Sequence, residues 1–158
     1  MYTLEYATQD DFKGGSDYIE ADCRFLELGC RWDDLTVKAG YEVLGSNGVY
    51  SFSTPFATLH AFNGWADKFL STPSNGLIDK YIMASFQIEL GERPLAIRAV
   101  YHDFKSDIKS VDYGEELDLL AQIKLCEGSS LMEKYAGYNA NEYATDTKKI
   151  WVAIQYSF

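Results

Sequence analysis

The chain ends with the stretch Ile150-Trp-Val-Ala-Ile-Gln-Tyr-Ser-Phe158, whose side chains alternate in character with a period of two. On an extended backbone such alternation puts one set of side chains on each face. The set that begins with Ile150 and continues through Val152, Ile154, Tyr156 and Phe158 is apolar or aromatic, and the other set contains Gln155 and Ser157. The segment therefore predicts a β-strand with one apolar face.

The same alternation recurs upstream and predicts an all-β chain. We expect about eight strands, in residues 2–8, 18–25, 35–43, 81–90, 95–102, 116–125, 131–140 and 150–158. Two irregularities stand out: Glu133 falls in the apolar phase of its strand, and Leu26-Glu27-Leu28 slips the phase of the second strand, which a β-bulge would explain. No segment predicts a long helix.

Composition limits the possible classes of function. The chain has 158 residues and a net charge of −10, which argues against a nucleic-acid partner because phosphate binding needs clustered Lys and Arg. No apolar run is long enough for a transmembrane helix. The three cysteines and two histidines have no zinc-ligand spacing, and no G-x-S-x-G motif occurs. We therefore expect one domain, 1–158, that is not an enzyme and has no catalytic residues, metal or cofactor.

The connections between the expected strands alternate in length. Short turns fall at 31–34, 91–93 and 126–129, and long links fall at 9–16, 45–78, 105–114 and 141–146. Short turns at one end and long loops at the other are typical of outer-membrane barrels. The pattern favours an antiparallel up-and-down sector of a transmembrane β-barrel, and an incomplete one, with 45–78 as a long extracellular loop. Two alternatives stay open: a soluble small β-barrel that binds an apolar ligand, and an adhesive surface protein.

The charged side chains lie mostly in the phase opposite to the apolar one. In a transmembrane barrel the apolar face meets lipid and the other face lines the lumen. On that basis the expected pore-lining residues are Glu20, Asp22, Arg24, Lys38, Glu42, Glu89, Arg98, His102, Asp118, Lys124 and Lys134.

The link 45–78 is too long for a plain turn and predicts structure of its own. Thr54-Pro55 is a typical helix start, and Phe56, Leu59, His60 and Phe62 follow at helical spacing. Such a segment either folds into the lumen and narrows it or packs as an extracellular cap. The candidate constriction residues are His60, Trp65, Asp67 and Lys68.

Several blocks of the chain resemble a known family. The C-terminal segment, with Tyr156 and Phe158, is similar to the strand by which outer-membrane barrels are recognised for assembly. The specific blocks resemble the C-terminal portion of large proteobacterial outer-membrane porins of the alginate-export-type family; they are Lys38-Ala-Gly-Tyr-Glu-Val-Leu-Gly45, Thr54-Pro-Phe-Ala-Thr-Leu-His-Ala-Phe-Asn-Gly-Trp-Ala-Asp-Lys-Phe-Leu70, Thr72-Pro-Ser-Asn-Gly-Leu77, Val100-Tyr-His-Asp-Phe104, Asp112-Tyr-Gly-Glu-Glu-Leu-Asp118 and Lys134-Tyr-Ala-Gly-Tyr138.

The resemblance implies a location and partners. The expected location is the outer membrane of a Gram-negative bacterium, and the expected function is a channel for a solute such as a polysaccharide or a small organic molecule. The expected partners are outer-membrane lipid, the barrel-assembly machinery, which would read Tyr156 and Phe158, and a small solute or oligosaccharide. Because barrels of this family have many more than eight strands, the resemblance also implies that the chain is a C-terminal fragment.

Overall fold

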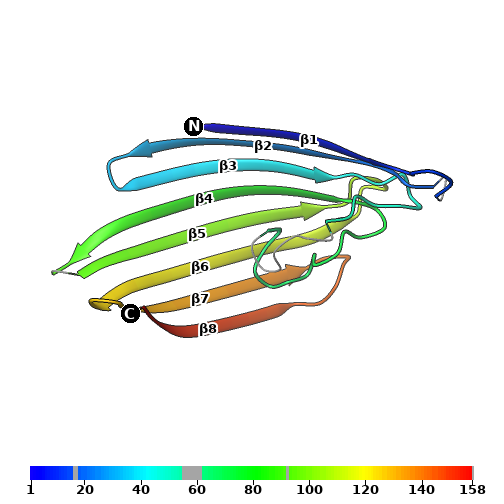
Figure 1. The fold of residues 1–158 in the computed structure, drawn as a ribbon. Helices are drawn as coiled ribbons and strands as arrows, with labels where there is room; N and C mark the ends of the chain where they lie inside the picture. The colour runs from blue at the N-terminus through cyan, green and yellow to red at the C-terminus, as the bar shows by residue number, and fades with distance from the viewer. Residues whose placement is uncertain (16–17, 55–61, 92, 158) are drawn as a thin grey trace.

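The computed structural model describes residues 1–15, 18–54, 62–91 and 93–157, and in these residues all regular structure is β-strand. Eight strands form one sheet in chain order, and each strand is antiparallel to the next (Figure 1). The all-β, up-and-down architecture predicted from the alternation is therefore confirmed. The strands are β1 (Tyr2–Asp10), β2 (Glu20–Trp32), β3 (Leu35–Leu44), β4 (Leu77–Leu90), β5 (Arg93–Lys105), β6 (Asp112–Cys126), β7 (Ser129–Ala140) and β8 (Thr147–Tyr156).

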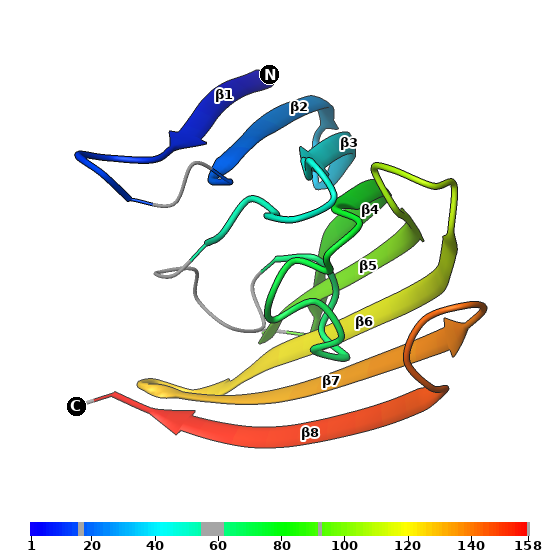
Figure 2. The same ribbon diagram turned by 90° about the vertical axis from the view of Figure 1, so that its right-hand side faces the viewer.

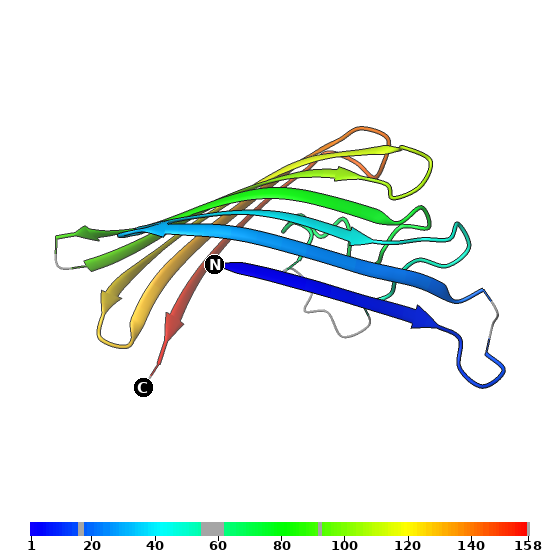
Figure 3. The same cartoon turned by 90° about the horizontal axis from the view of Figure 1, so that it is seen from above.

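The connections sort by length to opposite ends of the sheet. The short turns follow β2, β4 and β6 at Asp33-Asp34, Gly91 and Glu127-Gly128, as the sequence predicts. We call this side the turn end. The long links lie at the other side, the loop end, as Figure 3 shows, and the link between β3 and β4 is the longest of them.

The sheet is curved but not closed. Figure 2 shows the eight strands bent into a trough around the link between β3 and β4, with β1 and β8 at its two rims. No hydrogen-bond ladder joins β1 to β8 in the described residues. The sheet is thus incomplete, as the sequence predicts, and in the described residues each rim keeps a row of unpaired backbone groups.

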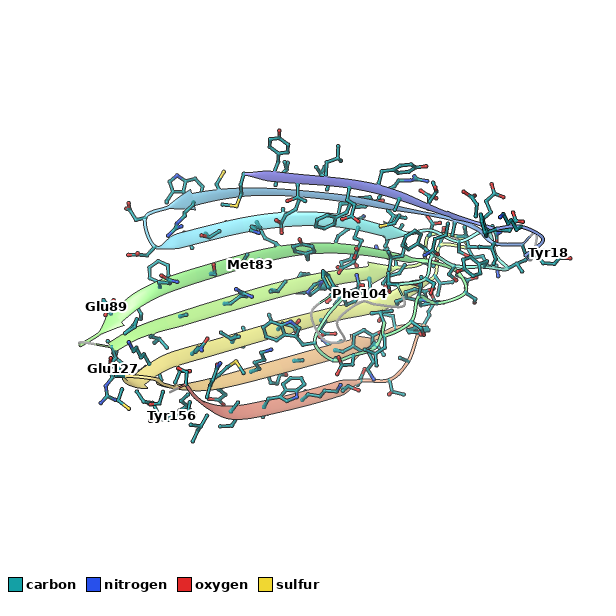
Figure 4. The ribbon with its side chains drawn as sticks, viewed as in Figure 1. Tyr18, Met83, Glu89, Phe104, Glu127 and Tyr156 are labelled. Atoms are coloured by element: carbon teal, nitrogen blue, oxygen red, sulfur yellow. The ribbon has the colours of Figure 1, made fainter. Side chains whose placement is uncertain are left out.

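The two faces of the sheet have inverted polarity. On the outer, convex face, Ile150, Val152 and Ile154 are 68%, 68% and 74% exposed. On the inner, concave face, Glu116 and Asp118 are completely buried. Figure 4 shows the labelled Met83 on the inner face and Glu89 and Glu127 at the turn end. Glu133 interrupts the apolar outer face toward the turn end, because it pairs with Val152 and is exposed there.

The start of β2 corrects the predicted assignment of faces. Ala21 and Cys23 point inward and are buried, so Glu20, Asp22 and Arg24 lie on the outer face and not among the inner charges. The pairing of β2 with both neighbours runs without a register shift, so the expected bulge at Leu26-Glu27-Leu28 is wrong. At the start of β2 the inner face is apolar, because loop residues cover it. From Leu26 onward the apolar side chains of this strand lie on the outer face instead.

An apolar core fills the loop end of the trough. Phe69, from the link between β3 and β4, lies 4.5 Å from Phe104, 5.8 Å from Tyr113 and 5.5 Å from Tyr143, measured between ring centroids. Leu44 and Leu77, which flank this link, are almost completely buried. Burial of these side chains fixes the link on the inner face, since each large apolar side chain contributes roughly 1.5–3 kcal/mol.

Substitution of Gly114 tests how closely the backbones of β6 and β7 approach each other. Its φ is +114°, and an added Cβ would overlap the Asn139 carbonyl oxygen. Gly91 has a φ of +68° with nothing near its Cβ position. We expect Gly91→Ala to lower the free energy of unfolding by about 1–2 kcal/mol from backbone strain alone. Gly114→Ala should cost roughly 1–3 kcal/mol more, from the overlap with backbone. Urea unfolding of the two variants measures the difference, and equal losses would contradict the tight register.

Candidate functional site

Part of the link between β3 and β4 lies against the inner face of the sheet. Asn63, Trp65, Ala66 and Phe69 are buried there, and no helix occurs in residues 62–76. The expected helix, with Pro55, Phe56, Leu59 and His60, falls on residues 55–61, which lie outside the described residues. We call residues 62–70 the inner loop.

Two carboxyl groups of β6 hold the inner loop in place. Glu116 and Asp118 are two positions apart, so both point to the inner face. The Ala66 amide donates to Glu116 Oε1 at 2.6 Å, and the Trp65 amide donates to Asp118 Oδ2 at 3.1 Å. Hydrogen bonds from backbone amides to charged acceptors are among the stronger ones in proteins. Two consecutive backbone amides of the inner loop thus donate to the carboxyl groups at two consecutive inward positions of β6.

Gly64 makes this close approach possible. Its φ is +83°, a conformation that favours glycine, and an added Cβ would lie 2.5 Å from Glu116 Oε2. Any other residue would have to displace either the loop or the carboxyl group. The glycine in Asn63-Gly64-Trp65 therefore allows the loop backbone to approach Glu116 closely, although Gly64 and Glu116 lie about fifty residues apart in the chain.

A second polar group lies beside the first. His102 of β5 donates from Nδ1 to Asp79 of β4 at 2.9 Å, and its Nε2 lies 3.8 Å from Asp118 Oδ2. The ring stacks on Phe104, with centroids 5.2 Å apart. Asn63 donates from Nδ2 to Glu42 Oε2 at 2.6 Å and to Asp79 Oδ2 at 3.3 Å. The inner loop thus joins the carboxyl groups of β3 and β4 to those of β6.

The centre of this polar layer carries unsatisfied acceptors. Glu116 and Asp118 lie within hydrogen-bonding reach of each other. Beyond this contact, Glu116 Oε2 and Asp118 Oδ1 have no hydrogen-bond partner among the described residues. No group of three or more His, Cys, Asp or Glu in the described residues is placed to hold a metal ion. The layer thus concentrates acidic groups without a ligating geometry.

The other side of the inner loop is fixed by cations of β7 and β8. Lys149 Nζ lies 2.6 Å from Asp67 Oδ2, and Lys134 Nζ lies 4.8 Å from the centroid of a Trp65 ring. Lys68 Nζ lies 5.6 Å from the Tyr138 ring centroid. Ion pairs and cation–π contacts of this kind contribute about 0.5–1 kcal/mol each at partly exposed sites. Together they anchor the loop across the width of the trough.

The polar inner face continues from the loop toward β2 and β3. The Tyr81 ring occupies the space where a Cβ of Gly40 would lie, so the missing side chain leaves room for the ring. Its hydroxyl donates to Glu27 Oε2 at 2.7 Å, and Lys38 donates to Glu27 Oε1 at 2.8 Å. Glu27 is therefore a satisfied inner carboxylate.

The structure separates the residues expected at the pore. The inner face carries eight of them, at Lys38, Glu42, Glu89, Arg98, His102, Asp118, Lys124 and Lys134. Glu20, Asp22 and Arg24 lie on the outer face, and Arg24 pairs there with Asp22. Trp65, Asp67 and Lys68 all lie in the inner loop, whereas His60 and Phe158 are outside the described residues. Tyr156 is exposed on the outer face.

Sequence reasoning missed four residues of the site. Glu116 lies in a strand whose alternation was recognised, and its inward phase is the signal that identifies it. Asp79 and Lys149 precede the expected starts of their strands, at 81 and 150, so neither was assigned a face. Asn63 acts through a loop contact that no sequence period reveals.

Toward the turn end the trough is open. A hollow of ≈ 500 Å³ is lined there mainly by amides and hydroxyls, including Gln87, Gln122, Ser130 and Gln155. The inner face therefore runs from an apolar core at the loop end, through an acidic layer, to a polar surface that includes Lys124. Such a face suits water and polar solutes.

The Gly64 contact yields a test of the inner loop. We expect Gly64→Ala to displace the loop because its Cβ would meet Glu116, and to move the Trp65 fluorescence maximum to longer wavelength. Gly48→Ala is the matched control, since Gly48 has a φ of +88° in the same link but only Ile108 Cδ1 nearby, at 3.5 Å. Identical spectra for the two variants would contradict the tight contact.

The unsatisfied oxygens yield a second test. Gln at position 116 keeps the acceptor for Ala66 and adds an amide donor facing Asp118. We expect Glu116→Gln to raise the free energy of unfolding by about 1 kcal/mol, because a buried acceptor gains a partner. Glu127→Gln in an exposed turn should leave it unchanged. A loss of stability in Glu116→Gln, measured by urea unfolding, would show that both carboxylates are needed.

Comparison of the chain with protein-family models, curated proteins and solved structures found no match. The resemblance noted in the sequence therefore stays a prediction. The described residues contain no helix that is long and apolar enough to cross a membrane. The function is accordingly argued from the two faces of the sheet and from the inner loop.

Proposed function

We propose that the chain is a sector of an outer-membrane β-barrel that passes small polar solutes. The observation that carries the proposal is the inverted polarity of the sheet. Ile82, Leu119 and Val152 are exposed on the outer face, while Asp79, Glu116 and Asp118 are buried on the inner one. In water this arrangement exposes apolar surface and buries charge, both at a cost. In a bilayer the outer residues meet lipid, and the inner ones line a hydrated lumen.

The open rims fit the same proposal. A sheet with two unpaired edges cannot cross hydrocarbon, where backbone groups find no water. Further strands between β8 and β1 would complete the hydrogen bonding and widen the trough into a channel. The inner loop then narrows that channel at the level of Glu116 and Asp118. In the outer membrane of a Gram-negative bacterium, Tyr156 would lie near the bilayer surface and belong to the segment read by the assembly machinery.

The alternative of a soluble barrel with an apolar ligand has less support. That function needs an apolar interior along the length of the barrel. Here the interior is apolar only at the loop end, and loop side chains such as Phe52 and Phe69 already fill it.

A pair of arginine substitutions on β6 tests the proposal. Leu119 points outward at the middle of the strand, and Gln122 points into the open trough. We expect Leu119→Arg to reduce association of the open sheet with phospholipid vesicles, because an arginine on the lipid-facing side costs roughly 2–4 kcal/mol at the bilayer midplane. Gln122→Arg should associate with vesicles like the original chain. Flotation of the vesicles on a density gradient measures the bound fraction.

The result that overturns the proposal is equally clear. If the original chain stays with the soluble fractions, or if Leu119→Arg floats as well as Gln122→Arg, the outer face does not meet lipid.

A further inference from the structure

A cavity of ≈ 390 Å³ lies between the start of the inner loop and the inner face of β1 to β5. Rings form much of its wall, with Phe25 and Tyr81 on the sheet and Trp65 on the loop. The buried pair Asp79 and His102 forms another part of it. The cavity thus combines aromatic faces with ionisable groups in a partly enclosed space, which is the usual composition of a small-molecule site.

The charge of the wall is predominantly negative. Four carboxyl groups line it, those of Glu5, Glu27, Glu42 and Asp79, against the cations Lys38 and Arg98. Lys38 is already paired with Glu27 at 2.8 Å. Within the described residues Glu42 receives only the amide of Asn63, and no cationic side chain is paired with Glu5. The lining therefore holds carboxylates that a bound cation can neutralise.

Strand register places these groups side by side. Glu5 pairs with Phe25, Phe25 with Glu42, and Glu42 with Asp79. Directly paired residues have Cβ atoms roughly 4.5–5.5 Å apart. The Phe25 ring is consequently flanked by a carboxylate on each side. An aromatic face between carboxylates attracts organic cations through its quadrupole and through direct charge pairing.

We propose that this cavity binds a small alkylammonium cation. The ammonium group lies on Phe25 between Glu5 and Glu42, and the hydrocarbon part lies against Trp65 and Val100. The inference deepens the proposed function, and its transport meaning rests on that function, because it names the class of solute that the lumen selects. A cation bound there also bridges β1 to β3 and the inner loop.

The experiment compares two ligands of the same shape by calorimetry on the full chain in detergent solution. Choline carries a quaternary ammonium, and 3,3-dimethyl-1-butanol is its neutral counterpart. We expect choline to bind about tenfold more tightly, a difference within the range of a desolvated cation–π contact with charge pairing. Glu42→Gln, which keeps the acceptor for Asn63, should weaken choline binding about tenfold and leave binding of the neutral alcohol unchanged. Phe25→Leu should weaken choline binding about fivefold.

Two further variants keep the test decisive. Glu133→Gln removes a carboxylate from the outer face and should bind choline like the original chain. If Glu42→Gln does not fold, Glu5→Gln at an exposed position replaces it with the same expected loss. Equal affinity for choline and the alcohol, or no choline binding up to ~10 mM, would overturn the inference. Calorimetry needs no bilayer, so choline binding and vesicle association are measured independently. Loss of choline binding with intact vesicle association contradicts only the cation site, and choline binding without vesicle association contradicts only the proposed function.

Discussion

The contact between the inner loop and the two β6 carboxyl groups decides the shape of the interior. Consecutive amides of Trp65 and Ala66 donate to Asp118 and Glu116 on the inner face. Without these donors the two completely buried carboxyl groups would lose the loop amides as partners, and a buried polar group left without a partner costs about 1–3 kcal/mol. The loop and the acidic layer are therefore interdependent, because the loop amides satisfy the carboxyl groups and those groups fix the loop.

Glycines make two of the close contacts on the inner face possible. Gly64 allows Glu116 Oε2 to approach the loop backbone, and Gly40 makes room for the Tyr81 ring. In each case a missing side chain on one element leaves space for a polar or aromatic group from another. The result is an inner surface that is closely packed around the acidic layer but leaves a cavity toward β1 and β2.

The interior changes character along its length, and this change connects structure to the proposed function. Aromatic packing around Phe69 closes the loop end, the acidic layer lies next to it, and amides and hydroxyls line the turn end. Under the proposed function, a solute in this interior meets the acidic layer beside the inner loop. Such a layer would disfavour anions relative to cations, since desolvated like charges repel strongly.

The sequence by itself determined the strands, their order and their turns. A period of two is a local property, and the short turns at Asp33, Gly91 and Glu127 predict antiparallel pairing of β2 with β3, β4 with β5 and β6 with β7. It also identified the outer face from β3 to β8, where exposed residues such as Leu119 and Val152 follow the alternation. The inward phase further identified Asp118 and His102 as inner residues.

Only the tertiary structure decided which face of β2 points inward near the loop end. Alternation gives two faces but does not say what covers each one, so Asp22 and Arg24 were assigned to the inner face although Cys23 is buried there. The loop contact was equally hidden, because its donors are backbone amides, which every residue except proline carries. Sequence periodicity reports the local direction of side chains. Burial, and with it the acidic layer and its cavity, arises from contacts between segments far apart in the chain.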